Sequence, residues 1–258
     1  MNSTLALSVI LPSYNEEQNI KTGVLNQVYD FLSRRTKDWE LILSDDGSTD
    51  STPQLLDAFA ASHPQVKVLH NHHAGKAATV KTGMLSARGE WRLFSDFDQS
   101  TPLSEVDKLM KYADKYQVII GSREGTGAAR EKEPWYRHLM GRVFNLAVRI
   151  IAVPGIEDTQ NGFKLFSAQA CQDLFERLYV YGPHQRFKDA YTGSFDVELL
   201  FLARKMGYQI KEVPIIWRHR ATNRVSPIKD SIRMFRDVMR VRLADLRGLY
   251  HLDQPRVS

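Results

Sequence analysis

The stretch Leu7-Ser8-Val9-Ile10-Leu11-Pro12-Ser13-Tyr14-Asn15-Glu16 decides the fold, because a short apolar run ends abruptly in turn-forming and acidic residues. Two later segments repeat the pattern: Leu41-Ile42-Leu43 runs into Asp45-Asp46-Gly47-Ser48, and Trp91-Arg92-Leu93-Phe94 runs into Asp96-Phe97-Asp98. Short apolar runs that alternate with helical stretches predict a parallel sheet covered by helices. The sequence therefore predicts an α/β, Rossmann-like single domain with a mostly parallel central sheet and helices on both faces.

The acidic residues that follow these runs mark the candidate functional site. Ligands bind beyond the carboxyl ends of parallel strands, so we expect Asp45, Asp46, Asp96 and Asp98 to meet at one rim. Four carboxylates repel one another unless a cation or hydrogen-bond donors, such as a ribose or a base, compensate their charge. Asp96 and Asp98 alternate along an extended strand end and could face one Mg²⁺ or Mn²⁺, although such pairs also cap turns.

Composition indicates an ordinary globular protein of 258 residues, with 43% hydrophobic and 25% charged residues. The lone Cys171 cannot form an internal disulfide and fits a reducing compartment. No run approaches the roughly 18–20 apolar residues of a membrane span. No basic segment precedes the first apolar run, so we expect no signal peptide.

Charge is distributed unevenly along the chain. Residues 1–200 carry 22 basic and 25 acidic residues, whereas residues 201–258 carry 13 basic and 5 acidic residues. A basic C-terminal end indicates an anionic surface or ligand there. Because no nucleic-acid-binding motif accompanies the charge, we expect an anionic membrane surface and no nucleic-acid partner.

The expected elements alternate regularly as far as residue 123. Helices are predicted for Glu16–Arg35 with Asn15 as the N-cap, from Thr52 with Thr52 as the cap, for Lys76–Arg88 and for Ser104–Tyr116. Strands are predicted at Val66–Leu69 and Val118–Ile120, and a mobile loop at Gly125–Glu133. We therefore divide the single domain into a nucleotide-sugar-binding half, 1–123, and an acceptor half, 124–258.

Two later helices have unusual faces. In Leu139–Val153 a narrow polar stripe of His138, Arg142, Asn145 and Arg149 interrupts an otherwise apolar helix. This pattern is typical of a buried core helix or of an amphipathic helix in a membrane interface. Lys229–Arg247 is predicted to be a helix with a basic stripe formed by Arg233, Arg236, Arg240 and Arg247. The apolar residues on its other faces are Ile232, Met234, Val238 and Val241.

Several motifs together resemble the inverting family 2 glycosyltransferases, over about residues 7–245. The nucleotide-sugar half of that family is similar to Pro12–Glu16, Asp45–Asp50, Gly75-Lys76 and Asp96-Phe97-Asp98. Gly121-Ser122-Arg123, Asp158–Phe166 and Phe195–Leu200 resemble the branch of dolichyl-phosphate β-glucosyltransferases and, less closely, dolichyl-phosphate mannose synthases. The resemblance implies a GT-A fold, a UDP-sugar donor, Mg²⁺ or Mn²⁺, and a polyprenyl-phosphate lipid acceptor.

The resemblance also implies roles for individual residues. The catalytic residues would be Asp98, Arg123 and Asp158, and the metal ligands Asp96 and Asp98, with Ser100 where mannose synthases carry a metal-binding Gln. The nucleotide and sugar would contact Pro12, Tyr14, Glu16, Asp45, Asp46, Lys76, Asp96, Gln160 and Asn161. Acceptor phosphate would meet Arg123, Arg218, Arg220 and Arg224, although a solvated loop explains the last three equally well. His72 and His73 lie on a polar loop and are not expected to bind metal.

The leading interpretation is an enzyme that transfers a hexose, glucose first among the candidates, from a UDP-sugar to a polyprenyl phosphate at the cytoplasmic face of a membrane. A phosphate acceptor is already anionic near neutral pH and needs no strong general base. If the acceptor were a hydroxyl, a base would be needed, and Asp158, Asp196 and Glu198 are the candidates. The alternatives are a related transferase using GDP-mannose or a hydroxyl acceptor, and a non-catalytic nucleotide-sugar or lipid-binding module.

Overall fold

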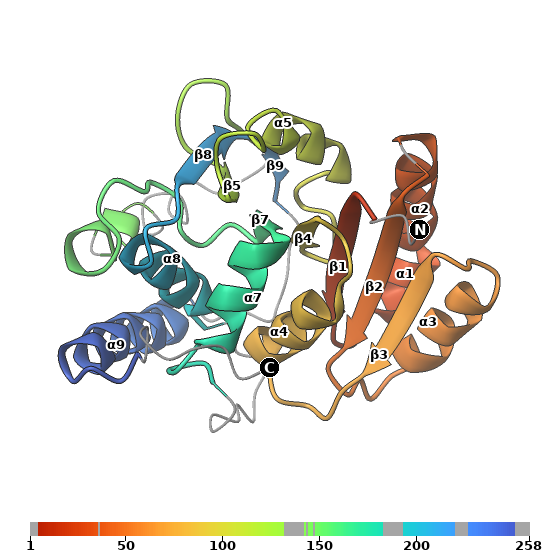
Figure 1. The fold of residues 1–258 in the computed structure, drawn as a ribbon. Coiled ribbons are helices and arrows are strands. Elements are labelled where there is room, and N and C mark those ends of the chain that lie inside the picture. The colour runs from red at the N-terminus through yellow and green to blue at the C-terminus, as the bar shows by residue number, and fades with distance from the viewer. Residues whose placement is uncertain are drawn as a thin grey trace.

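The computed structural model describes residues 5–35, 37–131, 142, 144–146, 148–182, 193–219 and 227–250. This part of the chain forms a seven-stranded sheet in the order β3-β2-β1-β4-β7-β5-β8 and a two-stranded sheet of β6 and β9 (Figure 1). The strands are β1 (Leu7–Ser13), β2 (Trp39–Asp45), β3 (Val66–His70), β4 (Trp91–Ser95), β5 (Val118–Ser122), β6 (Ala129–Glu131), β7 (Phe163–Ser167), β8 (Ile210–Pro214) and β9 (Ile216–Arg218).

Helices cover both faces of the large sheet, as the sequence predicted. They are α1 (Glu17–Lys21), α2 (Val24–Arg35), α3 (Thr52–Ala61), α4 (Lys76–Ser86), the short 3-10 helix η1 (Leu103–Glu105), α5 (Val106–Met110), α7 (Ala168–Glu176), α8 (Phe195–Lys205) and α9 (Pro227–Leu246). Alternate strand residues belong to two cores: Leu41 and Leu43 lie in the core that also contains residues of α2, α3 and α5, and Ile42 lies in the core that contains residues of α4, α7, α8 and α9. This alternation is the period of two of an extended strand, buried on both faces.

The prediction of a mostly parallel sheet is confirmed. β3, β2, β1 and β4 are mutually parallel, and β5 is parallel to β8. β7 runs antiparallel to both of its neighbours, β4 and β5. This inserted strand follows the Asp158–Gly162 segment, so that segment arrives at the edge where β4 ends and Asp96 begins its turn.

Several expected helix boundaries and caps are wrong. The helix expected over Glu16–Arg35 is two helices, because the chain turns at Gly23 with φ of +84°. Asn15 does not cap it; Asn15 has φ of +54°, and its Oδ1 accepts a hydrogen bond of 2.8 Å from the backbone of Thr49. The hydroxyl of Thr52 likewise accepts from the Glu16 backbone at 2.8 Å instead of capping its own helix.

Other expected bounds are shortened. The helix beginning at Lys76 ends at Ser86, and the one expected over Ser104–Tyr116 is η1 followed by α5, ending at Met110. The segment expected to be a loop over Gly125–Glu133 contains β6, which pairs with β9. Pairing with a strand some 85 residues later leaves no periodic signal in the segment itself.

The helix expected over Leu139–Val153 is only partly described. Residues 142, 144–146 and 148–151 are helical. Val148 and Asn145 are buried, whereas Leu146 and Ile150 are 55% and 75% exposed. This segment is therefore neither a wholly buried core helix nor a free one. Nowhere in the described ranges is there a helix both long and apolar enough to cross a membrane.

Candidate active site

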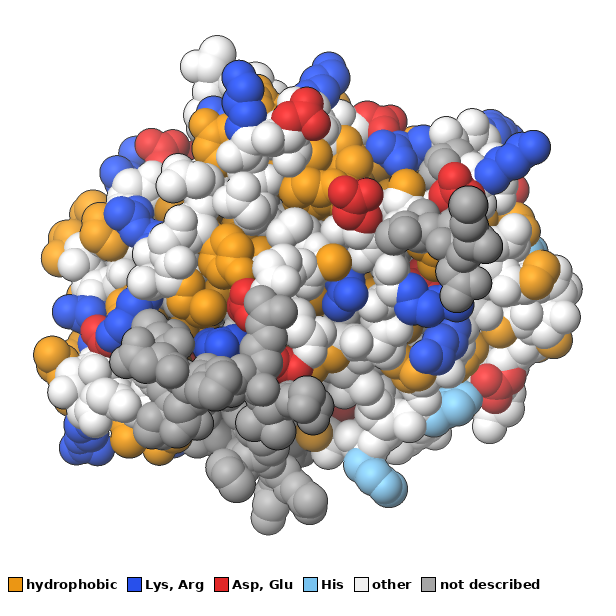
Figure 2. Space-filling model, viewed as in Figure 1, with side chains coloured by type: hydrophobic (Ala, Val, Ile, Leu, Met, Phe, Trp, Pro, Cys, Tyr) orange, Lys and Arg blue, Asp and Glu red, His pale blue; other side chains and the backbone are white. Residues whose placement is uncertain are grey.

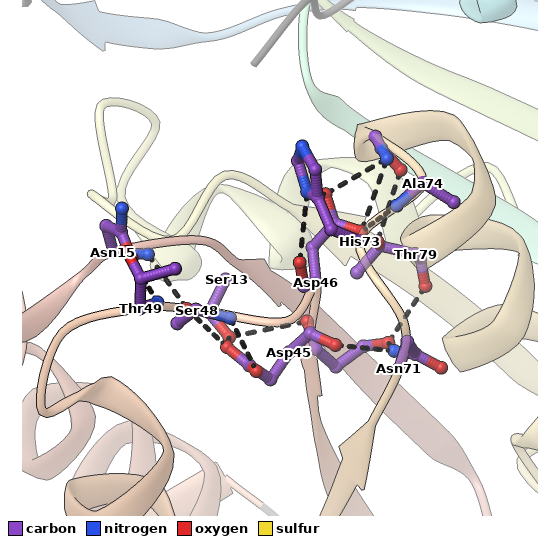
Figure 3. A network of polar contacts seen from close by, with 12 residues as sticks. Ser13, Asn15, Asp45, Asp46, Ser48, Thr49, Asn71, His73, Ala74 and Thr79 are labelled. Carbon is purple, nitrogen blue, oxygen red and sulfur yellow. Dashed lines mark hydrogen bonds and ion pairs between the residues drawn. The ribbon is translucent and has the colours of Figure 1, made fainter. Parts of the chain in front are cut away.

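The carboxyl ends of β1 and β2 meet in a polar network at one rim of the sheet (Figure 3). Asp45, 1% exposed, ends β2 opposite Ser13. Its carboxylate accepts hydrogen bonds from the hydroxyl and the backbone N–H of Ser48, at 2.5 and 3.1 Å. The Asn71 side chain donates to the backbone carbonyl of Asp45 at 2.8 Å. Asp45 is thus held in one position at the strand end by hydrogen bonds to its side chain and its backbone.

Asp46 fixes the start of α4. Its carboxylate accepts from the backbone N–H groups of Ala74 and Gly75, at 2.9 and 3.1 Å, and contacts Nδ1 of His73 at 3.0 Å (Figure 3). Gly75 has φ of +92°, which favours glycine at this position. Asp46, predicted to bind the donor, therefore uses both oxygens to hold the loop that delivers Lys76, the first residue of α4.

Three other predicted donor residues follow or end β1. Tyr14 stacks on His73, with ring centroids 4.5 Å apart and planes 20° apart, and so leaves an aromatic surface at the rim. Glu16 is buried and accepts from the Asn19 side chain at 2.5 Å. Pro12 lies half-buried within β1. His73 is engaged by Asp46 and His72 is exposed.

Asp96 and Asp98 lie beyond β4 with the buried Phe97 between them. The extended strand end expected for the two aspartates is wrong, because this segment is a turn closed by a hydrogen bond of 3.1 Å from the Gln99 backbone N–H to the carbonyl of Asp96. Asp96 accepts from Nζ of Lys76 at 2.5 Å. A Cβ at Gly162 would overlap both carboxylate oxygens of Asp96, so the absence of a side chain there lets the two segments approach. Asp98 accepts from the backbone N–H and the hydroxyl of Ser100, at 2.9 and 2.8 Å.

The described residues hold no group of three or more His, Cys, Asp or Glu side chains able to bind a metal. Two carboxylates are nevertheless enough for a metal that also binds the substrate, because Mg²⁺ is usually held by one or two carboxylates together with substrate phosphates. Three of the four buried polar side-chain atoms without a partner in the described ranges belong to Gln99, Gln160 and Asn161, next to Asp98 and Gly162. Such atoms are rare in native proteins, and a bound ligand would satisfy them.

Arg123 and Asp158 form a buried bidentate ion pair. Nε and Nη2 of Arg123 donate to the two oxygens of Asp158 at 2.7 and 2.9 Å, and the Arg123 backbone N–H donates at 2.9 Å. The guanidinium also lies 5.3 Å from the ring centroid of Trp217. Burial alone would raise the pKa of Asp158, but the charge and hydrogen bonds of Arg123 outweigh it and lower that pKa to about 2. Asp158 is therefore ionised, and both of its oxygens accept hydrogen bonds from Arg123.

A second buried pair, which is not predicted from the sequence, lies next to the Gln160–Asn161 segment. Nζ of Lys164, a residue with no exposed surface, donates to Asp196 at 2.6 Å and to the backbone carbonyl of Asn161. Burial raises the pKa of Asp196 despite the attraction of Lys164 and Lys76. Lys164 could have been suspected, because a lysine inside the apolar strand Phe163–Ser167 is almost never fully buried unless it is paired.

Lys76 connects this pair to the rim. Burial acts to lower the pKa of Lys76, but the attraction of Asp96, Asp196 and Asp98 outweighs it and raises that pKa, so the side chain is an ammonium at neutral pH. Positive and negative groups therefore alternate from Asp96 to Lys76, Asp196 and Lys164. The chain of charges ends at the backbone of the Gln160–Asn161 segment.

Glu198, another candidate base, has a structural position. Its carboxylate accepts from the backbone N–H groups of Tyr179, Val180 and Tyr181, at 2.8, 2.7 and 2.9 Å. The Tyr250 hydroxyl donates to it at 2.9 Å. Glu198 thus ties α8 to the segment before residue 183 and to the C-terminal end of the described chain.

The predicted acceptor arginines are only partly placed. The backbone N–H of Arg218 donates to the carbonyl of Ser100 at 2.8 Å, which brings the end of β9 next to the Asp98 turn. The Arg218 side chain is exposed and pairs with Glu131 at 2.9 Å. Arg220 and Arg224 lie outside the described residues.

A cleft of about 240 Å³ opens beside the Arg123–Asp158 pair. Part of the polar stripe predicted for 139–153 lines it, and the remaining lining residues include the neighbours of the pair in sequence: Glu124, Arg142, Asn145, Leu146, Arg149 and Glu157. Oδ1 of Asn145 accepts from the Thr159 hydroxyl at 3.3 Å, which joins this helical segment to the Asp158–Gly162 segment.

Comparison with known proteins identifies the family of the chain. The sequence model described as Glycosyl transferase family 2 matches residues 8–175. A protein named dolichyl-phosphate beta-glucosyltransferase in Saccharomyces cerevisiae is 32% identical, over 95% of this chain and 76% of the relative. The protein of the same name in Homo sapiens is 31% identical, over 98% of this chain and 80% of the relative.

Solved structures share the fold at low sequence identity. Glucosyl-3-phosphoglycerate synthase from Mycobacterium tuberculosis, crystallised with Mn²⁺, uridine diphosphate and phosphoglyceric acid, gives a TM-score of 0.62 at 21% identity, covering 94% of this chain and 78% of that one. Mannosyl-3-phosphoglycerate synthase from Rubrobacter xylanophilus gives 0.61 at 18% identity, covering 98% of this chain and 77% of that one. The predicted GT-A fold is confirmed.

Proposed function

This chain belongs to glycosyl transferase family 2 and is a glycosyltransferase, and we propose that it transfers glucose from UDP-glucose to a dolichyl-type polyprenyl phosphate. One observation carries the choice of a phosphate acceptor over a hydroxyl. Each candidate general base is already engaged: Asp158 by Arg123, Asp196 by Lys164, and Glu198 by three backbone N–H groups and Tyr250. An acceptor that arrives as an anion needs none of them.

In the proposed reaction an acceptor phosphate oxygen attacks the anomeric carbon from the face opposite the leaving group. The bond from that carbon to the β-phosphate oxygen of UDP breaks, UDP departs with the electron pair, and the sugar configuration inverts. No proton has to move. The protein's task is to bring two anions together and to neutralise the departing diphosphate.

The cations for this task would lie at the two sides of the rim. Mg²⁺ or Mn²⁺, which Asp96 and Asp98 would hold, supplies charge neutralisation for the departing diphosphate when bound. On the acceptor side Arg123 is oriented by Asp158, and the cleft lined by Arg142 and Arg149 offers an approach for an anionic head group. Arg218, Arg220 and Arg224 remain proposed acceptor residues.

The donor is proposed to occupy the 1–123 half and the acceptor the 124–258 half. Asp45 would contact the uracil and Asp96 the ribose or diphosphate, with the rigid strand ends fixing both. The orphaned amide atoms of Gln160 and Asn161 would contact the transferred sugar. Pro12, Tyr14 and Glu16 would line the nucleotide, with Lys76 at the diphosphate.

The decisive experiment offers the purified protein a panel of UDP- and GDP-sugars with short polyprenyl phosphates and with polyprenols that lack the phosphate. Products are identified by mass spectrometry, with and without Mn²⁺ after chelation. We expect glucosyl polyprenyl phosphate from UDP-glucose, only with a divalent cation. Transfer to the hydroxyl of a polyprenol, or from GDP-mannose in preference to UDP-glucose, would overturn the proposal.

We also propose that the enzyme works as a peripheral protein on the cytoplasmic face of a membrane, through α9. One face of this helix presents a row of exposed apolar side chains, spaced by 3, 4, 4 and 3 residues: Ile232, Phe235, Met239, Leu243 and Leu246. Arg236, Arg240 and Arg247 are exposed beside it. Figure 2 shows hydrophobic and basic side chains side by side over the edge of the molecule where α9 lies. This combination fits an anionic lipid surface.

The faces of α9 differ from those expected from the sequence. Ile232, Val238 and Val241 are expected on one apolar face opposite the arginines, but Val238 and Val241 are buried against the rest of the protein while Ile232 is exposed. The arginines accompany the exposed row instead of facing away from it.

The free thiol of Cys171 fits a reducing compartment such as the cytoplasm.

Vesicle co-sedimentation tests the surface. Wild type should bind vesicles that contain phosphatidylserine, and high salt should release it. Arg236→Gln with Arg240→Gln should weaken binding about thirtyfold, at about 1 kcal/mol for each arginine. Phe235→Ser should also weaken binding, whereas Arg34→Gln, which removes one exposed arginine from α2, should not. Failure of wild type to bind at low salt would refute the assignment.

A further inference from the structure

We propose that Lys76 holds Asp96 in place of the divalent cation until the nucleotide arrives, so that cation and nucleotide bind cooperatively. The inference rests on the metal-dependent transfer proposed above and assigns a positioning role to a residue of the donor side. Lys76 has this role when neither nucleotide nor cation is bound, and the contacts around Asp96 support it.

The ammonium of Lys76 is paired with the carboxylate of Asp96, which a metal ion would need as a ligand. Its Nζ lies 2.5 Å from Oδ1 of Asp96, and both side chains are largely shielded, at 25% and 36% exposure. The backbone at Gly162 also packs closely against this carboxylate, since a Cβ there would overlap both oxygens. A cation that binds Asp96 must therefore share a crowded carboxylate with Lys76, and two positive charges at one carboxylate repel each other.

Lys76 is free to exchange partners while its backbone stays fixed. Asp46 holds the N–H groups of Ala74 and Gly75, so the start of α4 cannot shift. The lysine side chain is a flexible stem that ends in a compact charge with three donors. It stands at the N-terminus of α4, an eleven-residue helix, where the helix dipole disfavours a cation but favours an anion such as a diphosphate.

A nucleoside diphosphate satisfies all the groups at once. Its phosphate oxygens give Lys76 a new partner, which releases Asp96, and the same phosphates supply ligands that a cation shares with Asp96 and Asp98. Cation alone must compete with Lys76, and nucleotide alone brings an anion near two carboxylates. Each ligand therefore improves the affinity for the other by the same factor, as linkage requires.

The test measures Mn²⁺ binding directly, by the paramagnetic resonance of free Mn²⁺ and by calorimetry, with and without UDP. Wild type should bind Mn²⁺ weakly alone and much more tightly with UDP. Lys76→Met should bind Mn²⁺ alone about tenfold more tightly than wild type, because the competing cation is gone. Its gain on adding UDP should be smaller than that of wild type. Lys81→Met removes a lysine from the same helix and should behave as wild type, and Lys76→Gln serves if Lys76→Met does not fold.

The outcomes separate the two proposals. If wild type binds Mn²⁺ with UDP but Lys76→Met binds Mn²⁺ alone no better than wild type, the exchange is refuted and metal-dependent transfer stands. If wild type binds no Mn²⁺ even with UDP, metal dependence itself falls, and the role of Lys76 falls with it. An equal gain in Lys81→Met would show a general charge effect and would also refute the exchange.

Discussion

Replacing Asp158 by Asn tests the energetics of the site most sharply. The change keeps the side-chain shape but removes the charge that holds Arg123, leaving a guanidinium that is only 18% exposed without its counter-charge. The pKa of Asp158 is lowered from 3.8 to about 2, and each pH unit corresponds to about 1.4 kcal/mol. Removing one partner of a buried pair typically costs about 3–5 kcal/mol. We expect the free energy of unfolding to fall by about 2–4 kcal/mol at neutral pH.

The sign of the pH dependence follows from the lowered pKa. An acid whose pKa is depressed in the folded protein stabilises the fold fully above its ordinary pKa and loses that contribution as pH falls through the folded value. The difference between wild type and Asp158→Asn should therefore be constant near neutrality and should shrink between about pH 4 and pH 2. Urea unfolding followed by tryptophan fluorescence at a series of pH values measures it.

The control is Asp107→Asn, the same substitution in an ion pair with Arg35, where the aspartate is 53% exposed. Exposed pairs contribute about 0–1 kcal/mol, so the control should change stability little. If Asp158→Asn costs no more than Asp107→Asn at neutral pH, the Arg123–Asp158 pair does not stabilise the protein. If the difference grows on acidification, the ionised state assigned to Asp158 is wrong.

Three further predictions follow from the site and the core. Gly162→Ala should weaken Mn²⁺–UDP binding about tenfold in calorimetry, because its Cβ overlaps the carboxylate of Asp96; unchanged affinity would place Asp96 outside the donor site. Arg123→Ala should lower acceptor-dependent transfer at least about 100-fold, whereas Asp158→Asn should lower the rate without removing an acidic limb from the pH–rate profile. Loss of that limb would make Asp158 a general base. Cys171 is fully buried, and burial raises its pKa to about 12, so iodoacetamide should modify it only after unfolding; rapid alkylation of the native protein would contradict this.

The position of the site could be predicted from the sequence because strand ends are local features. Apolar runs that stop at Pro12–Glu16, at Asp45-Asp46 and at Asp96-Phe97-Asp98 identify the carboxyl ends of three strands. In a parallel sheet those ends share one edge whatever the order of the strands. The register of β1 with β2 and of β1 with β4 places them there.

The backbone conformation just beyond a strand end was not predicted from the sequence. Asp96-Phe97-Asp98 is expected to be extended but lies in a turn, which a hydrogen bond from the Gln99 backbone N–H to the carbonyl of Asp96 closes at 3.1 Å. Helix capping was less reliable. Asn15 and Thr52 carry good capping side chains, but each binds the neighbouring loop, since the competing partner is supplied by a segment more than 30 residues away.

Only the tertiary structure decided which charges meet. Arg123 with Asp158, Lys76 with Asp96, and Lys164 with Asp196 join segments that are distant in the chain, and no periodicity identifies such partners. The antiparallel strand β7 contributes to two of these pairs, because Asp158 lies in the segment that leads into it and Lys164 lies within it.

The surface of α9 that we propose to face lipid shows the same division. The sequence of α9 contains apolar residues around most of its circumference, so amphipathicity alone permits more than one buried face. Packing against α8 buries Val238 and Val241 and leaves the row from Ile232 to Leu246 exposed. A sequence determines how many faces of a helix are apolar, but the neighbour against which the helix packs determines which of them remains for a membrane.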